Sequence, residues 1–119
     1  MTEYILLIPD DEEQWAARSE DERQRTYDRH REFAAALAAR GHKVTGGAEL
    51  APSKEARTVR RRDGALHVTE GPYAEAVEQL SGFYLIESDD LDDLVECVGM
   101  LAVDESPLEL RACRDGSSS

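Results

Sequence analysis

Two short runs of the sequence are apolar on both alternating faces, which predicts strands at the centre of a covered sheet. The first runs from Glu3 to Ile8, where Pro9 ends it, and the second runs from Gly82 to Glu87. A strand with apolar side chains on both faces has to be covered on both sides. Two further strands are predicted, one at residues 42–50 that breaks at Gly46-Gly47 and one at Pro107–Cys113.

Helical periodicity predicts two helices. From Ser19 to Arg40, Ser19 and Glu22 make a capping-box pattern, acids fill the first turn, and Gly41 follows the end. One face of this helix contains Tyr27, His30, Phe33, Ala34 and Leu37. A second helix is predicted after a Ser88 cap, with a buried stripe made of Leu91, Leu94, Val95, Val98 and Leu101.

A hairpin is predicted between these elements. The segments 57–62 and 65–70 flank Asp63-Gly64, a pair that supplies the positive φ angles of a two-residue turn. The predicted order is β-α-β-(β-β)-β-α-β, an α+β chain with a ferredoxin-like split βαβ core and an inserted β-hairpin. We expect a single domain at residues 1–113 and a disordered tail at 114–119.

The helices of such a fold cover only one face of the sheet, whereas two predicted strands are apolar on both. A second copy of the chain is the economical cover. We therefore expect a homodimer in which two sheets pack face to face as a dimeric α+β barrel.

Charge and composition exclude several classes of partner. The 119 residues have a formal net charge of −12, which repels nucleic acid and anionic membranes, and the one concentration of basic residues is Arg57–Arg62. Neither a membrane span nor a signal peptide is evident, so we expect a cytoplasmic protein with Cys97 and Cys113 as free thiols.

The segment "TEGPYAEAVEQLSGFYLIE", preceded by the "TVRRRDG" hairpin and by "EYILLI", resembles the DGPF group of the YCII-related family. The signature of that group is Asp-Gly-Pro-Phe, then acids, then a Gly-Gly-Phe-Tyr strand. Here it becomes Glu70-Gly71-Pro72-Tyr73 and then Ser81-Gly82-Phe83-Tyr84. The resemblance implies a ferredoxin-like fold, a dimeric α+β barrel, and small-molecule enzymes that use a histidine and an acid without metal or organic cofactor.

In the wider YCII-related family a histidine precedes the glycine that ends the first helix by eleven residues, and His30 and Gly41 reproduce that spacing. Three departures from the family pattern suggest a pocket rebuilt for another substrate. Glu70 replaces aspartate, Tyr73 replaces phenylalanine, and Arg61 stands where an apolar residue is usual.

The candidate catalytic pair is therefore His30 and Glu70. His30 would move a proton near neutral pH and Glu70 would orient it or act as the base, while Tyr73, Arg61 and Tyr84 would contact the substrate. The structural alternatives stay open: His30 and Tyr84 as packed core residues, and Glu70 as the cap of the Gly-Pro turn.

Two kinds of function fit these residues. The first is a cofactor-free enzyme in which acid/base chemistry drives elimination, isomerisation, cyclisation or hydrolysis of a small organic molecule, in bacterial secondary metabolism. The second is a non-catalytic dimer that binds a ligand or partner in regulation, and an accessory subunit for a basic protein is a third, weaker possibility. No metal site is expected, because the histidines and cysteines lack ligand spacing, and no phosphate loop or serine nucleophile elbow is present.

Overall fold

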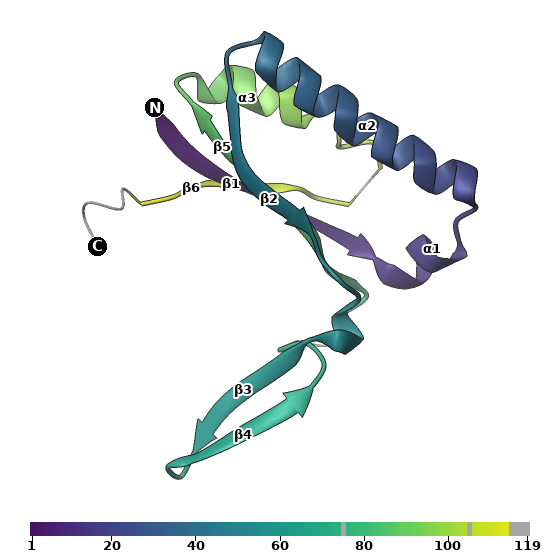
Figure 1. Ribbon diagram of the computed structural model, residues 1–119, viewed down its shortest axis with the longest axis vertical. Helices are drawn as coiled ribbons and strands as arrows, with labels where there is room; N and C mark the ends of the chain where they lie inside the picture. Colours follow the sequence, from purple (N-terminus) through teal and green to yellow (C-terminus); the bar gives the residue numbers. More distant parts are fainter. Residues whose placement is uncertain (75, 105, 115–119) are drawn as a thin grey trace.

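The computed structural model describes residues 1–74, 76–104 and 106–114, and a four-stranded antiparallel sheet forms its centre (Figure 1). The strands lie in the order β2-β5-β1-β6. Their bounds are Thr2–Asp11 for β1, Lys43–Glu49 for β2, Glu78–Ser88 for β5 and Glu109–Ala112 for β6. This order of strands, together with the helices between them, is that of a ferredoxin-like α+β fold, as the sequence predicts.

The two longer helices pack on one face of the sheet. They are α2 at Glu20–Ala39 and α3 at Leu91–Val98, and the shorter elements are α1 at Glu12–Ala17 and the 3-10 turn η1 at Ser53–Glu55. The buried core joins strands to helices through Leu6, Phe33, Leu37, Ile86, Leu94, Cys97 and Val98. Burial of these side chains is the main stabilising contribution, at about 1.5–3 kcal/mol for each large one.

The signals that predict α2 are all present in the structure. The Ser19 hydroxyl accepts from the backbone N–H of Glu22, and the Glu22 carboxylate accepts from that of Ser19, which completes the capping box. These hydrogen bonds lower the pKa of Glu22. After the last turn, Gly41 takes a φ of 84°, the left-handed conformation that glycine reaches without steric cost.

The predicted hairpin is confirmed with its bounds. β3 spans Arg57–Arg62 and β4 spans Ala65–Glu70, and the turn residues Asp63 and Gly64 have φ angles of 51° and 78°. The hairpin projects away from the sheet and helices (Figure 1). The radius of gyration is consequently 16.6 Å, against about 13.5 Å for a compact chain of this length.

Several strand bounds differ from the prediction. β1 does not end at Pro9 but continues to Asp11, because a bulge between Ile8 and Pro9 lets the proline occupy the strand without its missing N–H interrupting the ladder. β2 runs across Gly46-Gly47 with a register shift after Val44. β5 begins four residues before Gly82, and β6 is confined to Glu109–Ala112.

The prediction for the second long helix was wrong in its cap and in part of its stripe. Asp90 is the N-cap of α3, since its side chain accepts from the backbone N–H of Asp93, whereas the Ser88 hydroxyl bonds to His42 and to the backbone of Asp90 itself. Leu91 and Val95 are exposed, whereas Cys97 is buried, as expected for a thiol beside the apolar stripe. Of the predicted tail, residues 115–119 lie outside the described residues.

The face of the sheet turned away from the helices has no cover among the described residues. Tyr4, Leu6 and Ile8 pack toward the core, so the alternating Ile5 and Leu7 point to the other side. On β5, Phe83 and Leu85 are cross-strand partners of Leu7 and Ile5. We call the surface made by Ile5, Leu7, Phe83 and Leu85 the open sheet face. No helix in the described parts of the chain is long and apolar enough to cross a membrane.

Candidate functional site

His30 and Tyr84 meet between α2 and β5. The imidazole Nδ1 lies 2.8 Å from the Tyr84 hydroxyl, and the two rings stack with centroids 5.9 Å apart. Phe33, one turn along the helix, packs edge-on against the same tyrosine at 5.4 Å. Both predicted residues therefore lie in one place, and the hydroxyl that the sequence placed within an apolar strand holds the histidine ring.

The second nitrogen of His30 is free to meet a ligand. Nε2 has no hydrogen-bond partner among the described residues, and no buried side-chain nitrogen or oxygen among them lacks a partner. Nε2 must therefore reach solvent, although the side chain as a whole is half-buried. An imidazole with one nitrogen held and the other open can exchange a proton with a bound molecule.

The surroundings favour the neutral form of this imidazole. Burial lowers the pKa of His30 below its ordinary value of 6.5, the positive charge of Arg29 lowers it further, and Glu49 opposes both. Burial likewise raises the pKa of Tyr84, which keeps that phenol protonated. At neutral pH His30 is therefore uncharged and able to accept a proton, with a protonated hydroxyl beside it.

Glu49 and Tyr27 stand next to this pair, and neither was predicted as a site residue. Glu49 ends β2, and its carboxylate accepts from the Tyr27 hydroxyl at 3.1 Å. Burial and this hydrogen bond raise the pKa of Tyr27. Among the described residues, Glu49 is thus the carboxylate whose charge acts on His30.

Glu70 lies at the base of the hairpin. Its carboxylate is 3.9 Å from the Arg57 guanidinium, and its side chain is 80% exposed. The next residue, Gly71, has a φ of 105° and donates its N–H to the Ala56 carbonyl, so the glycine shapes the turn as predicted. Within one chain Glu70 makes no hydrogen bond to His30, so the orienting role stays a prediction.

An open cleft of about 700 Å³ adjoins Glu70. Its lining includes Gly71 and Pro72 of the signature loop, the acidic residues Asp11, Glu12 and Glu13, and Lys54. The Glu12 carboxylate accepts from the backbone N–H of Ser53 at 2.7 Å, so one of these acids already ties α1 to η1. The signature loop therefore turns the chain and also borders a cleft, and the cleft is lined by more acidic than basic residues.

The other two predicted contacts lie on the hairpin and in the loop after it. Tyr73 is 83% exposed, and the Arg60 guanidinium carbon lies 5.6 Å from the centre of its ring. Arg61 points to the opposite face of the hairpin, where it donates to the Gly64 carbonyl at 3.0 Å. The alternation of the arginines is as predicted, but it separates Arg61 from Tyr73.

A second cluster surrounds the buried His42. Its Nδ1 lies 2.8 Å from the Ser88 hydroxyl, and its Nε2 donates to Asp93 at 2.7 Å. The ligand atoms of His42, Asp93 and Cys97 lie within 4.8 Å of one another, which makes them the residues best placed to hold a metal ion. The hydrogen bonds already satisfy both ring nitrogens, and Arg40 binds the same carboxylate, so this cluster is stable without a cation.

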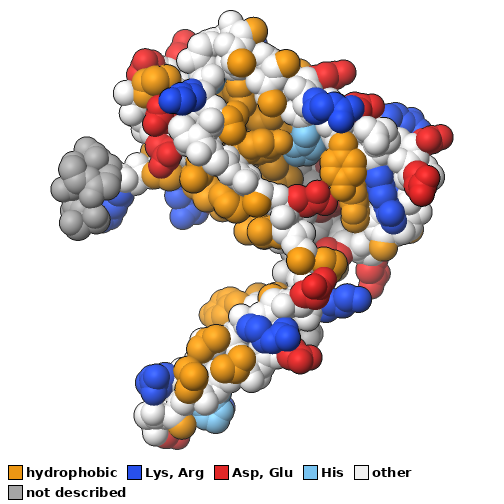
Figure 2. Space-filling model, in the orientation of Figure 1, with side chains coloured by type: hydrophobic (Ala, Val, Ile, Leu, Met, Phe, Trp, Pro, Cys, Tyr) orange, Lys and Arg blue, Asp and Glu red, His pale blue; other side chains and the backbone are white. Residues whose placement is uncertain are grey.

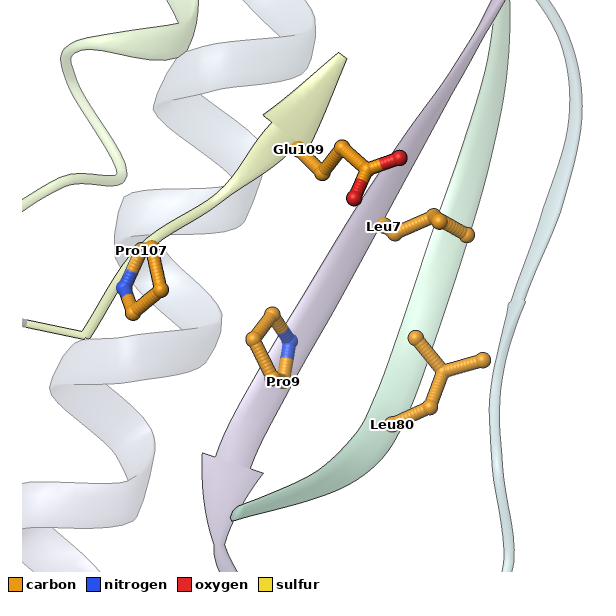
Figure 3. Close-up of a pocket in the computed structure, with 5 residues that line it drawn as sticks. All are labelled: Leu7, Pro9, Leu80, Pro107 and Glu109. Atoms are coloured by element: carbon orange, nitrogen blue, oxygen red, sulfur yellow. The ribbon is translucent and has the colours of Figure 1, made fainter. Parts of the chain in front are cut away.

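A shallow apolar hollow of about 280 Å³ lies on the side of the sheet away from the helices (Figure 3). Leu7, Pro9, Leu80 and Pro107 line it, and Glu109 is the one charged residue among the described residues that do. No predicted site residue takes part in it.

Comparison with known proteins places the chain in a family. The sequence profile of the YCII-related domain matches residues 2–101. An uncharacterised protein of Rhizobium meliloti (strain 1021) is 35% identical over 95 residues, which cover 78% of this chain and 74% of that protein.

Proposed function

The chain belongs to the YCII-related family, and we propose that it is a homodimeric, cofactor-free protein that performs acid/base chemistry on a small organic molecule at His30. The observation that carries this proposal is the half-buried imidazole with Nδ1 held by Tyr84 and Nε2 open to solvent. The dimer would form through the open sheet face, where an apolar surface otherwise meets water.

The proposed chemistry begins with proton abstraction. With Nδ1–H donated to the Tyr84 oxygen, Nε2 presents a lone pair that accepts a proton from the substrate. The imidazolium that forms still donates from Nδ1 and can return its proton from Nε2. Elimination, isomerisation, cyclisation and hydrolysis all contain such a step, and the depressed pKa of His30 favours the base at the start.

The substrate contacts follow from what surrounds Nε2. Glu49 and Tyr27 are the proposed polar contacts on the helix side of the sheet, because the charge of Glu49 raises the pKa of His30 and Tyr27 donates to Glu49. Glu70, Tyr73 and Arg61 remain proposed contacts from the hairpin and its loop. Glu70→Gln, Tyr73→Phe and Arg61→Lys test these three contacts separately.

The test is a ligand screen observed at the histidine rings by long-range ¹H–¹⁵N NMR. Small carbonyl compounds, phenols and carboxylic acids are added to the native protein, and a true ligand shifts the His30 ring signals while His42 and His67 serve as internal references. His30→Gln should abolish binding without unfolding the chain. Ligands that bind His30→Gln equally well would overturn the proposal.

A non-catalytic ligand-binding dimer is the second candidate. The edge-on packing of Phe33 against Tyr84 favours it, since that contact gives the tyrosine a packing role apart from any chemistry. Incubation with each ligand from the screen separates the candidates. Chemical change that disappears in His30→Gln supports catalysis, whereas unchanged ligand supports binding alone.

A further inference from the structure

The β3–β4 hairpin pairs only with itself among the described residues. Its two strands form a separate two-stranded sheet, and nearly every residue in them is exposed. Val59, Leu66 and Val68 are 59%, 59% and 54% exposed. Because an isolated two-stranded hairpin is only marginally stable in water, an apolar hairpin of this kind needs a surface to rest on.

The register gathers the apolar side chains on one side of the hairpin. Val59 pairs with Val68, and Arg61 pairs with Leu66, so these four residues share one face, which we call the arm face. Arg60 and Ala65 belong to the other side. The arm face is thus apolar with a guanidinium among the apolar groups, while the reverse side is polar.

Charge separates the hairpin from the rest of the molecule. Residues 57–70 contain four of the chain's 14 basic residues and two of its 26 acidic ones, so the hairpin has a net charge of +2. The remaining residues then have −14, since the whole chain has −12. A basic arm on an acidic body is electrostatically complementary to the body of a second copy.

The open sheet face has the matching composition. Its apolar centre is Ile5, Leu7, Phe83 and Leu85, and the cross-strand partners Glu3 and Glu87 stand at one end of it. Two carboxylates directly opposite each other repel, and Lys43 of β2, the cross-strand partner of Glu87, is the cation beside them within the chain. The apolar hollow beside Leu7 adds one more acid, Glu109, which pairs with Arg111 of the same strand (Figure 3).

We propose that the hairpin is an exchanged arm, by which each of two copies of this chain lays its arm face on the open sheet face of the other. This inference rests on the homodimer of the proposed function, and it covers the open sheet face with the partner's arm in place of the partner's sheet. One isologous contact covers both exposed apolar surfaces and brings Arg61 toward the acids of the partner sheet. Space-filling shows the hydrophobic side chains that the hairpin presents to solvent (Figure 2).

Two substitutions on adjacent residues test the arm face. Leu66→Asp places a charge on it, whereas Ala65→Asp adds the same charge on the reverse side. By sedimentation equilibrium we expect Leu66→Asp to weaken the dimer by about tenfold or more and Ala65→Asp to leave it nearly unchanged. Equal effects of both variants, or a native chain that is monomeric at micromolar concentration, would overturn the arm.

A second measurement locates the arm on the partner. A nitroxide is attached to the new thiol of Ala65→Cys in a chain that also has Cys113→Ser; the remaining Cys97 is buried and is left in place. This nitroxide-bearing chain, at natural isotope abundance, is mixed with native chain that has no nitroxide and is enriched in ¹⁵N. We expect broadening of the amides of Glu3, Leu7 and Leu85 relative to Leu37 in the core. A dimer without this broadening overturns arm exchange. The histidine-ring screen for the proposed function does not depend on either result.

Discussion

His30 and His42 each make a hydrogen bond to a hydroxyl group of the same strand, but their surroundings differ. In each, Nδ1 lies 2.8 Å from a hydroxyl of β5, Tyr84 for His30 and Ser88 for His42. The difference is in the second nitrogen. His42 donates it to Asp93 in a buried setting, while the Nε2 of His30 remains open to solvent.

The number of hydrogen-bond partners, more than burial, therefore distinguishes a histidine that holds the fold together from one that can bind a ligand. Three segments meet at His42. His42 itself lies just before β2, Ser88 ends β5, and Asp93 lies on α3. Every polar group there has a partner, so the cluster stabilises the fold. His30 has a protein partner for Nδ1 alone among the described residues, which leaves Nε2 available to a ligand.

The largest expected effect comes from removing the His42 side chain. His42→Ala leaves Ser88 and Asp93 without their buried partner and should lower the free energy of unfolding by about 2–3 kcal/mol. His30→Ala should lower it by about 1 kcal/mol or less. Urea unfolding of the two variants measures the difference, and a loss from His30→Ala as large as that from His42→Ala would break the comparison.

Low pH should weaken the same cluster by protonating Asp93. The hydrogen bond from His42, together with Arg40, lowers the pKa of Asp93 below its ordinary value of 3.8. A carboxyl with a lowered folded pKa adds stability above its unfolded pKa and loses it as the pH falls through the folded value. Native protein and Asp93→Asn should therefore converge in stability below about pH 3.8, as measured by thermal unfolding across pH.

A smaller effect distinguishes the two carboxylates proposed for His30. Glu49 raises the pKa of His30 against burial, so Glu49→Gln should lower the midpoint of its NMR titration further. Glu70→Gln is the matched control with the same loss of charge. If Glu70→Gln moves the midpoint and Glu49→Gln does not, the originally predicted pair acts across subunits and the assignment to Glu49 fails.

The titration of His30 should also appear in stability. Because the folded pKa of His30 lies below 6.5, the folded chain binds fewer protons than the unfolded chain between the two values. Stability should therefore rise as the pH increases toward 6.5, and His30→Gln should remove this part of the slope. Urea midpoints between pH 5 and 7 measure the difference, and an unchanged slope contradicts the depressed pKa.

The smallest effect is expected at the rim of the site. Tyr27→Phe removes a hydrogen bond to Glu49 that is exposed to solvent, and the free energy of unfolding should change by no more than about 0.5 kcal/mol. The same variant should alter affinity for any ligand found in the histidine-ring screen. A ligand that binds Tyr27→Phe as tightly as the native protein removes Tyr27 from the proposed contacts.

Local chemistry explains why the hairpin and α2 could be predicted from sequence. Asp63-Gly64 and the Ser19 capping box act within a few residues, and both formed as expected. Ser88 was assigned to a helix cap because its local pattern fits one. Its hydroxyl instead meets His42, 46 residues away, and no local pattern reports such a contact.

The site was predictable to the same extent. The family resemblance made His30 a candidate through its spacing from Gly41, and the hydroxyl within an apolar strand made Tyr84 one; their roles stay predictions. Glu49 was missed because its position depends on the register shift of β2 after Val44, which decides the side of the sheet to which the carboxylate points. The alternation of β2 across its two glycines was the only signal available, and a predicted break there concealed it.

The arginine run of β3 bears on how newly made chains avoid aggregation. A two-stranded hairpin has unpaired backbone groups along both outer edges, which are templates for strand addition. Addition of an identical β3 edge would place Arg60, Arg61 and Arg62 beside the same residues of another chain, and their mutual repulsion opposes that pairing. Neutral residues at these positions would remove that repulsion and favour strand addition between copies.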